Sequence, residues 1–313
     1  MVEEGWKNQR VLVTGGAGFI GSHLVRRLVA LGATVLVLDD LSSGGRAQVP
    51  DGVELIVGGV ECSDVVEQAS ADCTTIFHLA ARVSVPEAEA DPETCRLVNV
   101  QGTANVVAAA VSRSARFVLA STCAVYGDPD SIPISESTPV EPLSVYGHSK
   151  ASAETITCEA IAAAGLQGSC LRLFNVVGHG QHVTSAYAAV VPRFAECLRA
   201  GAPPTIEGDG LQTRDFVPVD FVVECMVQTA MDPGEPVVNV GTGRETSLLE
   251  LLEHMQGMAG TKLQPTFAAG RIGDIRRSVA DVELLHHRIG SCEPSRLEHA
   301  LHAVLRQEST TSA

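Results

Sequence analysis

The chain has 313 residues, of which 45% are hydrophobic and 19% are charged, and its formal net charge at pH 7 is −15. A chain of this length can hold one large domain, or a large and a small one, with an ample buried core. The negative charge argues against nucleic acid or an anionic membrane as the main partner. An anionic ligand would therefore need arginines placed locally to bind it.

The cysteines and the N-terminus indicate the compartment. Nine cysteines are scattered without a Cys-x-x-Cys pair or the spacing of zinc ligands, which predicts reduced thiols and no metal site. The segment Met1–Lys7 lacks the basic-then-apolar order of a signal peptide. No apolar run is long enough to cross a bilayer. We therefore expect a cytoplasmic α/β protein that does not span a membrane.

Three glycines at three-residue spacing follow the apolar run 11–14 and precede an amphipathic helix. Gly15 permits a tight turn, Gly18 lets a pyrophosphate approach the backbone, and Gly21 lets the helix pack closely on the strand. The unpaired N–H groups at the start of the helix would bind the phosphates. The pattern predicts a dinucleotide site; a purely structural glycine-rich turn is the alternative.

An acidic residue ends the second predicted strand, residues 34–38, about 20 residues after the glycines, as ribose recognition requires. Asp39 is expected to accept a hydrogen bond from a ribose 2′-hydroxyl and to repel a 2′-phosphate. The sequence therefore predicts NAD, not NADP, as the cofactor. The turn-rich loop 40–45 is expected to close over the adenosine end.

The remaining elements alternate in type and then become less regular. Further strands are predicted at 53–57, 75–79, 116–120 and 168–174, with long helices at 92–112 and 146–164. This order predicts a Rossmann fold, an α/β doubly wound parallel sheet. Later elements are predicted as a helix at 186–200, a hairpin within 205–217, a strand at 237–240 and a helix at 248–258. We expect an NAD-binding domain, 1–175, and a smaller C-terminal substrate domain, 176–313, with the return of later segments to the first domain left open.

Tyr146 and Lys150 are one helical turn apart and share a helix face. A cation beside a phenol lowers the phenol pKa, as would the positive ring of an oxidised nicotinamide. Tyr146 is therefore a candidate general base near neutral pH. A Tyr-x-x-x-Lys pair alone is usually a surface pair, so the prediction depends on the upstream glycine motif. Thr122, at the end of the preceding strand, could donate a hydrogen bond to the reacting oxygen; a turn or cap hydroxyl is its alternative role.

At these motifs the chain resembles the extended short-chain dehydrogenases/reductases of the NAD-dependent nucleotide-sugar epimerase/dehydratase family, and most of all the UDP-glucose 4-epimerases. The resemblance covers nearly everything from Arg10 to about Arg306. The matching motifs are Thr14–Gly21, Leu38–Gly44, His78–Ala81, Ser121–Gly127, Tyr146–Lys150, Leu171–Asn175, Gln212–Phe216 and Gly273–Arg276. Together they are very specific for the family and moderately specific for the reaction.

The resemblance implies a role for each matching residue. Tyr146 is the base, Lys150 binds the nicotinamide ribose, and Thr122 fills the catalytic Ser/Thr position. The residues assigned to the cofactor are Gly15, Gly18, Phe19, Ile20, Gly21, Asp39, Asp40, Ser42, Ser43, Gly44, Gly59, Val60, Leu79, Ala80, Ala81, Asn99, Tyr146 and Lys150. Asn175, Arg214 and Arg271 are assigned to the diphosphate of the substrate. Asp274 is assigned to its ribose, and the small residue Ser278 to its sugar. Two guanidiniums suit a pyrophosphate inside a chain of net charge −15.

Four positions depart from the family pattern. Gly59 stands where relatives often carry an acid that holds the adenine amino group, so that contact is in doubt. Cys123 and Ala124 stand where hexose 4,6-dehydratases have Asp-Glu, which disfavours a standard 4,6-dehydratase. Cys123 could still act as an acid or base, or be a small buried apolar residue. Ser278 fills a place where a bulky aromatic can exclude N-acetyl groups, which suggests room for an N-acetylhexosamine.

The expected activity is that of a UDP-sugar 4-epimerase that works through a transient 4-keto sugar. A UDP-N-acetylglucosamine dehydratase of the 4,6- or 5,6-type, as in antibiotic biosynthesis and with Cys123 as acid/base, is the enzymatic alternative. A non-catalytic NAD-binding regulator is the alternative of another class, although such a protein has no use for a phenolate base. By analogy with the family we also expect a homodimer formed through the two long helices.

Overall fold

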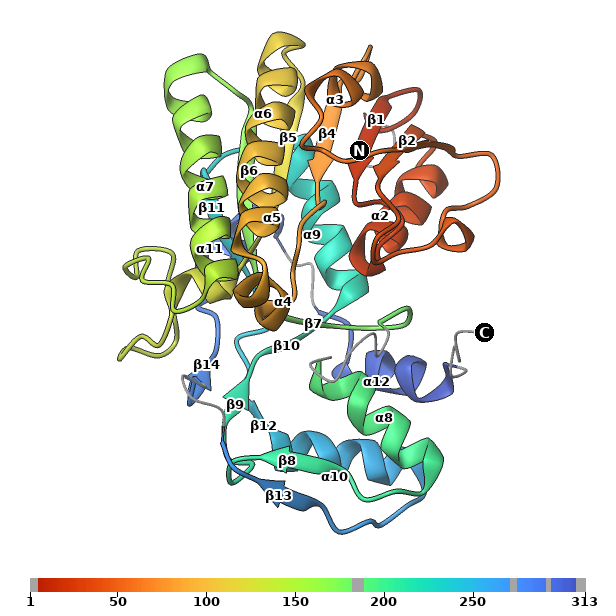
Figure 1. The fold of residues 1–313 in the computed structure, drawn as a ribbon, viewed down its shortest axis with the longest axis vertical. Coiled ribbons are helices and arrows are strands. Elements are labelled where there is room, and N and C mark those ends of the chain that lie inside the picture. The colour runs from red at the N-terminus through yellow and green to blue at the C-terminus, as the bar shows by residue number, and fades with distance from the viewer. Residues whose placement is uncertain (1–4, 182–188, 271–274, 291–293, 308–313) are drawn as a thin grey trace.

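The computed structural model describes residues 5–181, 189–270, 275–290 and 294–307. Figure 1 shows a sheet flanked by helices above a smaller body of short strands and helices. The sheet has seven parallel strands in the order β11-β6-β5-β4-β1-β2-β3. These strands are β1 (Arg10–Thr14), β2 (Thr34–Asp39), β3 (Glu54–Val57), β4 (Thr75–His78), β5 (Arg116–Thr122), β6 (Gly168–Leu173) and β11 (Val237–Val240). The predicted doubly wound Rossmann fold is confirmed.

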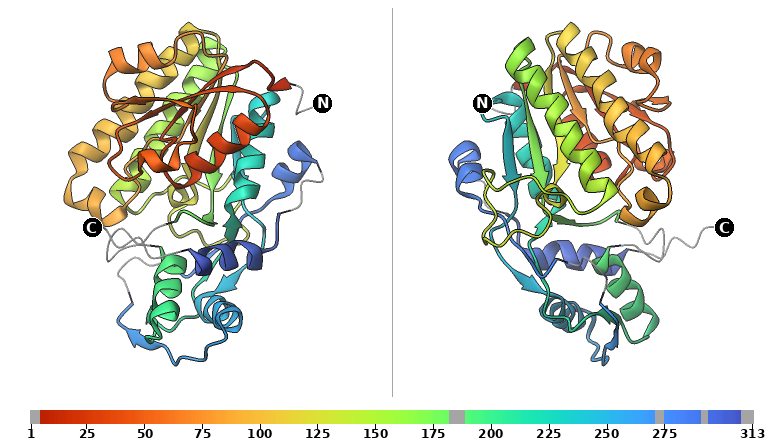
Figure 2. Two further views of the ribbon diagram at one scale, coloured as in Figure 1. Left: turned by 90° about the vertical axis from the view of Figure 1, so that its right-hand side faces the viewer. Right: turned by 60° about the vertical axis from the view of Figure 1, so that its left-hand side comes forward.

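Helices cover both faces of the sheet, because strands buried on both sides need apolar partners above and below. One face carries α2 (Phe19–Ala30), α9 (Val219–Met231) and α11 (Glu283–Ile289). The other carries α3 (Ser63–Ala69), α6 (Gly102–Ser112) and α7 (Val145–Ala164), and the turned views in Figure 2 separate the two layers. Two short helices, α4 (Val85–Ala90) and α5 (Pro92–Arg96), precede α6, while η1 (Arg46–Gln48) and η3 (Cys123–Tyr126) follow β2 and β5.

The smaller body has its own apolar core between three helices. These are α8 (Val190–Ala200), α10 (Leu248–Ala259) and α12 (Leu297–Arg306). Its short strands are β7 (Asn175–Val177) with β10 (Phe216–Pro218), β8 (Thr205–Glu207) with β13 (Thr266–Ala268), and β9 (Thr213–Arg214) with β12 (Thr246–Ser247) and β14 (Arg277–Ser278). The chain crosses between the two bodies several times, because α9, β11 and α11 return to the large sheet.

The predicted hairpin within 205–217 is wrong. β8 pairs in parallel with β13, while β9 pairs with β12 and β14. Between β8 and β9 the Gln212 side chain donates to the Glu207 carbonyl at 2.7 Å, which closes the loop without a backbone ladder. The glycines between 205 and 217 indicate a turn at that place only. The strands that pair with β8 and β9 lie much later in the chain, so the turn does not predict them.

The long helix predicted over 92–112 is interrupted by η2 (Leu97–Gln101), a π-helical turn. Such turns insert an extra residue and often occur at functional sites. Here the turn directs Asn99 into the protein interior, where 1% of its surface is exposed. The sequence pattern did not reveal this interruption.

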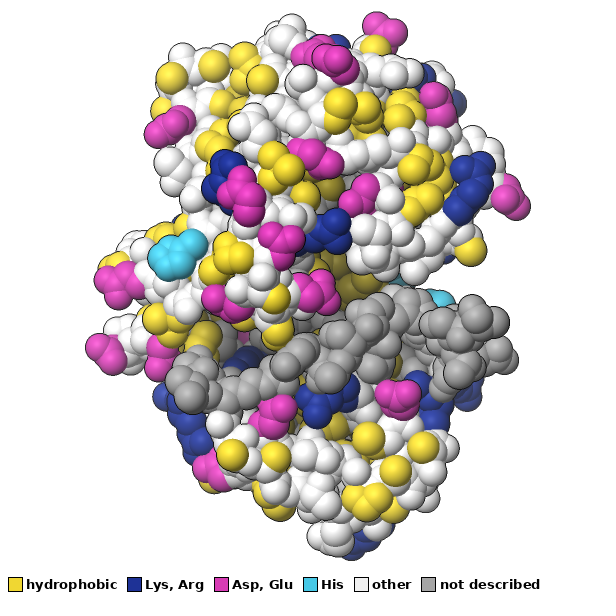
Figure 3. All heavy atoms as spheres, viewed as in Figure 1, with side chains coloured by type: hydrophobic (Ala, Val, Ile, Leu, Met, Phe, Trp, Pro, Cys, Tyr) yellow, Lys and Arg dark blue, Asp and Glu magenta, His cyan; other side chains and the backbone are white. Residues whose placement is uncertain are grey.

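Charges of both signs are distributed over the face seen in Figure 3, without a continuous basic surface. In the described part of the chain no helix is both long and apolar enough to cross a membrane.

Candidate active site

The turn between β1 and α2 is built around two very close approaches. Gly15 has a φ of +70°, and a Cβ there would lie 2.7 Å from the backbone nitrogen of Ala80. A Cβ on Gly21 would lie 2.1 Å from the carbonyl oxygen of Gly15. The turn therefore packs against the end of β4, and α2 begins directly on it. This geometry aims the first N–H groups of α2 into the cleft, as phosphate binding requires.

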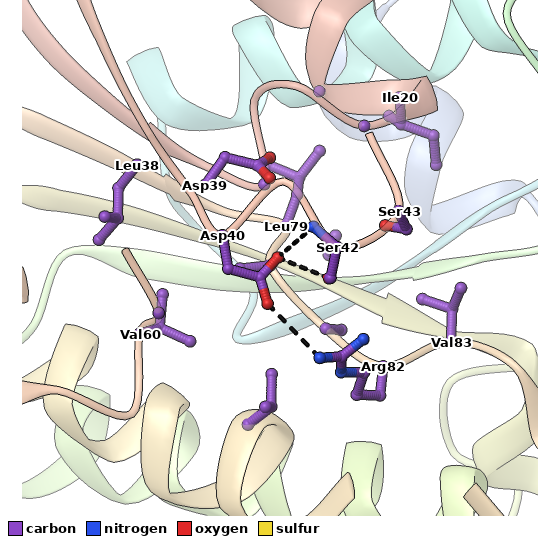
Figure 4. Close-up of a pocket in the computed structure, with 18 of the residues that line it drawn as sticks. Ile20, Leu38, Asp39, Asp40, Ser42, Ser43, Val60, Leu79, Arg82 and Val83 are labelled. Carbon is purple, nitrogen blue, oxygen red and sulfur yellow. Dashed lines mark hydrogen bonds and ion pairs between the residues drawn. The ribbon is translucent and has the colours of Figure 1, made fainter. Parts of the chain in front are cut away.

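Asp39 and Asp40 end β2 at the rim of the same cleft. The two Asp39 carboxylate oxygens accept from the backbone nitrogens of Ala17, at 2.9 Å, and Leu41, at 2.8 Å. Asp40 accepts from the backbone nitrogen and hydroxyl of Ser42, and its other oxygen lies 3.5 Å from the Arg82 guanidinium. Figure 4 shows this ion pair across the mouth of the cleft. Asp39 thus ties the glycine turn to the loop after β2 and still has lone pairs for a ribose.

The cleft collects residues from the ends of β1, β2, β3, β4, β5 and β6. All the residues predicted for the cofactor line it except Gly44 and Asn99. Lining residues that the sequence analysis missed are Leu38, Gly58, Glu61, Arg82, Val83, Val98, Ala120, Ser121 and Leu173. Their signal was positional, since each adjoins a predicted residue or a strand end. The glycine turn, the acidic strand end and the helix N-terminus fit a dinucleotide.

Gly44 and Asn99 do not line the cleft but hold segments that do. A Cβ on Gly44 would lie 2.2 Å from the Ala17 carbonyl oxygen, so Gly44 lets the loop after β2 pack on the glycine turn. The Asn99 side chain accepts from the Arg82 backbone nitrogen at 2.7 Å and donates to the Arg82 carbonyl at 2.9 Å and the Ser149 hydroxyl at 2.8 Å. Asn99 therefore fixes the segment after β4 to the helix that carries Tyr146.

Tyr146 and Lys150 enter the cleft from the first turns of α7, which Ser144 caps by accepting from the Gly147 backbone nitrogen at 3.0 Å. Burial lowers the pKa of Lys150 to about 8, against the opposing attraction of Glu154 one turn further along. Burial also raises the pKa of Tyr146, and a hydrogen bond with Thr122 opposes that rise. In the chain without a bound cofactor, burial is the largest influence on the Tyr146 pKa, and the lowering by Lys150 stays a prediction.

Thr122 is the last residue of β5 and combines both roles considered for it. Its hydroxyl accepts from the Ala124 backbone nitrogen at 3.2 Å, so it caps η3. The same hydroxyl is near enough to Tyr146 to oppose the rise of the phenol pKa. The capping bond fixes the direction of the Thr122 side chain at the phenol.

Cys123 follows Thr122 and connects the cofactor cleft to the smaller body. Burial raises the pKa of Cys123 to about 11, while the charge of Arg214 and a hydrogen bond with Ser278 act in the opposite direction. Ser278 on β14 pairs with Arg214 on β9 in the strand register. The structure thus brings together three residues that were singled out in separate parts of the sequence.

Asn175 begins β7, where its backbone nitrogen donates to the Asp215 carbonyl at 3.0 Å. Arg214 is held by Nη1, which donates to the carbonyls of Thr213, at 2.8 Å, and Ile275, at 2.7 Å. Arg271 and Asp274 lie outside the described residues. Within the ranges described above, His, Cys, Asp and Glu nowhere form a group of three or more able to hold a metal ion.

Comparison with known proteins agrees with this geometry. Residues 11–241 match the NAD dependent epimerase/dehydratase family. A UDP-glucose 4-epimerase from Mycolicibacterium smegmatis is 39% identical over 291 residues, covering 87% of this chain and 90% of the relative. Two solved structures are each 32% identical to the chain. One is a UDP-N-acetylglucosamine 4-epimerase from Methanobrevibacter ruminantium in complex with UDP-N-acetylmuramic acid (TM-score 0.91, 96% of this chain and 97% of the other). The other is an NAD-dependent NDP-hexosamine 5,6-dehydratase of tunicamycin biosynthesis (TM-score 0.87, 95% and 96%).

The chain belongs to the NAD dependent epimerase/dehydratase family. It is an enzyme whose cofactor is NAD, with the extended short-chain dehydrogenase/reductase fold. The predictions of fold, cofactor and enzymatic class are confirmed, and the resemblance to UDP-glucose 4-epimerases is borne out by the relatives.

Replacing Asp39 with asparagine tests the basis of cofactor choice. The asparagine side chain retains one oxygen acceptor for the neighbouring backbone but no longer repels a 2′-phosphate. We expect the preference for NAD over NADP to fall by about tenfold, the size of one charge-assisted interaction. Competitive binding of the two dinucleotides measures the preference. An unchanged ratio would assign the discrimination to another residue.

Proposed function

We propose that this chain is a UDP-sugar 4-epimerase acting on glucose- or N-acetylglucosamine-type substrates. The observation that carries the proposal is the place of Cys123, which adjoins Thr122 and Tyr146 on one side and Ser278 and Arg214 on the other. A sugar seated against Cys123 would have its 4-hydroxyl within reach of the phenol and its diphosphate on the side of Arg214. Guanidinium groups suit that diphosphate.

The side chains then have distinct tasks. Tyr146 takes the proton of the sugar 4-hydroxyl, and Thr122 holds the phenol by a hydrogen bond. Lys150 favours the phenolate by its positive charge. The cleft lined by the glycine turn, Asp39 and Lys150 would hold NAD, which would accept the C4 hydride and return it. After the 4-keto sugar turns over in the pocket, the hydride re-enters C4 on the opposite face and Tyr146 returns the proton, so atoms and electrons balance over the cycle.

Ser278 supports an N-acetylated sugar as substrate. Its side chain is small and 4% exposed, and it contacts the Cys123 thiol. A small residue here leaves more space beside the sugar than an aromatic ring would. The similarity to a UDP-N-acetylglucosamine 4-epimerase points in the same direction.

The direct test is incubation with UDP-glucose and, separately, UDP-N-acetylglucosamine, followed by mass analysis of the nucleotide sugars. A product of unchanged mass that separates from the substrate means epimerisation. Loss of one water means dehydration. No conversion of either substrate would contradict the proposal.

The dehydratase remains the second candidate because of the Cys123 thiol and the similarity to a hexosamine 5,6-dehydratase. Burial raises the pKa of the Cys123 thiol to about 11, so the thiol holds its proton at neutral pH but is a weaker acid than a group with a pKa near 7. For the proposed epimerase we expect Cys123→Ala to keep kcat within about threefold, since no step uses the thiol. A dehydratase that depends on the thiol would lose about 10²–10⁴-fold, the usual contribution of a general acid. The same mass analysis, performed on the variant, decides between them.

We also propose a homodimer assembled through α6 and α7. Both helices keep partly exposed hydrophobic side chains at the edge of the core, among them Val111, Ile156 and Ile161. The eight cysteines that the structure describes are all free thiols, which supports a reducing cytoplasmic location for the enzyme.

A further inference from the structure

Glu61 occupies the space that Gly59 leaves open at the adenosine end of the cleft. Both residues line the cleft, in the turn after β3. A Cβ on Gly59 would lie 2.1 Å from Oε1 and 2.3 Å from Oε2 of Glu61. The Glu61 carboxylate therefore folds back over Gly59, and a side chain at position 59 would displace it.

The turn that carries Glu61 is fixed from two sides. The Gly58 backbone nitrogen donates to the Asp39 carbonyl at 3.0 Å, which ties the turn to the end of β2. From α6, the Asn105 side chain donates to the carbonyls of Val60 and Glu61, each at 3.0 Å. The backbone of Glu61 is therefore fixed by hydrogen bonds, next to Asp39, the residue expected to bind the adenosine ribose.

Three carboxylates line the cleft, and two of them have protein partners. Asp39 accepts from the backbone nitrogens of Ala17 and Leu41, and Asp40 accepts from Ser42 and pairs with Arg82. The Glu61 carboxylate accepts no hydrogen bond from the residues that the structure describes. The adjacent residues of the cleft wall, Gly58, Gly59 and Val60, have no side-chain oxygen or nitrogen that could accept a hydrogen bond from a ligand in place of Glu61.

We propose that Glu61 recognises adenine by accepting a hydrogen bond from its 6-amino group, in the space left by the missing side chain of Gly59. With the pyrophosphate at the glycine turn and the ribose at Asp39, a bound adenine would lie beyond the ribose, beside the turn that carries Glu61. A carboxylate accepts from an amino group and repels the 6-oxo group of hypoxanthine. The proposal concerns NAD binding alone and does not depend on which sugar the enzyme converts.

The test is a competition between NAD and its hypoxanthine analogue for the full-length protein. After incubation with equal concentrations of both, the retained dinucleotides are released and quantified by mass spectrometry. We expect the wild type to retain NAD in at least tenfold excess, and Glu61→Gln and Glu61→Ala to bring the ratio to within about threefold of unity. A glutamine can serve either base, because its amide both donates and accepts.

Two further variants make the result specific. Gly59→Asp combined with Glu61→Ala moves the carboxylate onto the neighbouring position, and it should restore a preference for NAD. Asp64→Asn removes an exposed charge from the nearby helix α3 and should leave the ratio as in the wild type. The proposal is overturned if the Glu61 variants keep the wild-type ratio, or if they lose both dinucleotides equally. Because the readout is cofactor identity, it is independent of the outcome with UDP-sugars.

Discussion

Tyr146→Phe is expected to lower kcat by about 10²–10⁴-fold, the range usual for loss of a general base. Phenylalanine fills the same space on α7 but cannot take a proton from the sugar 4-hydroxyl. The hydroxyl contact with Thr122 is also lost, yet Thr122 keeps its bond to the Ala124 backbone, so the end of β5 should not move. Binding of NAD and of UDP-sugar should stay within a few-fold of wild type. Steady-state kinetics with the preferred UDP-sugar, together with binding measurements, check both parts.

Tyr126→Phe is the matched control for this variant. The Tyr126 hydroxyl is buried and donates to the Asn239 side chain at 2.6 Å, outside the cofactor cleft. Its removal should reduce the free energy of unfolding by about 1–3 kcal/mol, because Asn239 loses a buried partner, and leave kcat near the wild-type value. Equal loss of kcat in the two variants would mean that the effect of Tyr146 is structural. A Tyr146→Phe enzyme of full activity would favour the non-catalytic regulator.

The parts of the site that the sequence predicts are those set by local chemistry. Gly15 and Gly21 were predictable because their roles follow from the short chain segment between them. Asp39 follows from its position at the end of a strand, and Lys150 from its helical spacing to Tyr146. In each case the structure places the residue in the cleft because the motif itself contains the geometry.

The parts that sequence reasoning missed depend on contacts between distant segments. Arg82 adjoins the predicted residue Ala81, but its ion pair with Asp40, 42 positions earlier, follows from no local pattern. Glu61 can reach the proposed adenine site only because Gly59 has no side chain. In the sequence, Gly59 is visible only as the absence of the acid that relatives often have there. Helix α9 was not predicted as a cover of the large sheet, because its long apolar sequence contains no signal of which sheet it contacts. The partner strands of β8 and β9 were hidden for the same reason.

The burial of Lys150 also shows a limit of motif reasoning. Spacing predicts that Lys150 and Tyr146 are neighbours, but only the structure shows that burial opposes the charged form of each. A positively charged nicotinamide ring bound beside Tyr146 would favour the phenolate.

Glu154→Gln should lower the free energy of unfolding by about 3–5 kcal/mol, because it leaves a buried arginine without its counter-charge. Glu154 on α7 and Arg172 on β6 are each 5% exposed and pair through Arg172 Nη2 at 2.7 Å. Ser121, next to Thr122, donates to Glu154 Oε1 at 2.5 Å. The variant should also reduce kcat, because Lys150 loses a nearby negative charge and the amide has a single acceptor oxygen for both Ser121 and Arg172. Urea unfolding followed by the fluorescence of the buried Trp6 measures the stability.

The double variant Glu154→Leu/Arg172→Met separates the effect of an unpaired buried charge on stability from the effect of losing the Glu154 carboxylate on kcat. Removing both charges should recover part of the stability, because no unpaired ion remains in the interior. It should not recover kcat, since leucine offers Ser121 no acceptor and Lys150 no neighbouring carboxylate. Glu93→Gln, at an exposed pair with Arg96, should change neither measurement. If Glu154→Gln were as stable as the Glu93 variant, the buried pair would not be holding α7 against β6, and the catalytic end of β5 would have to be positioned by Thr122 and its backbone contacts alone.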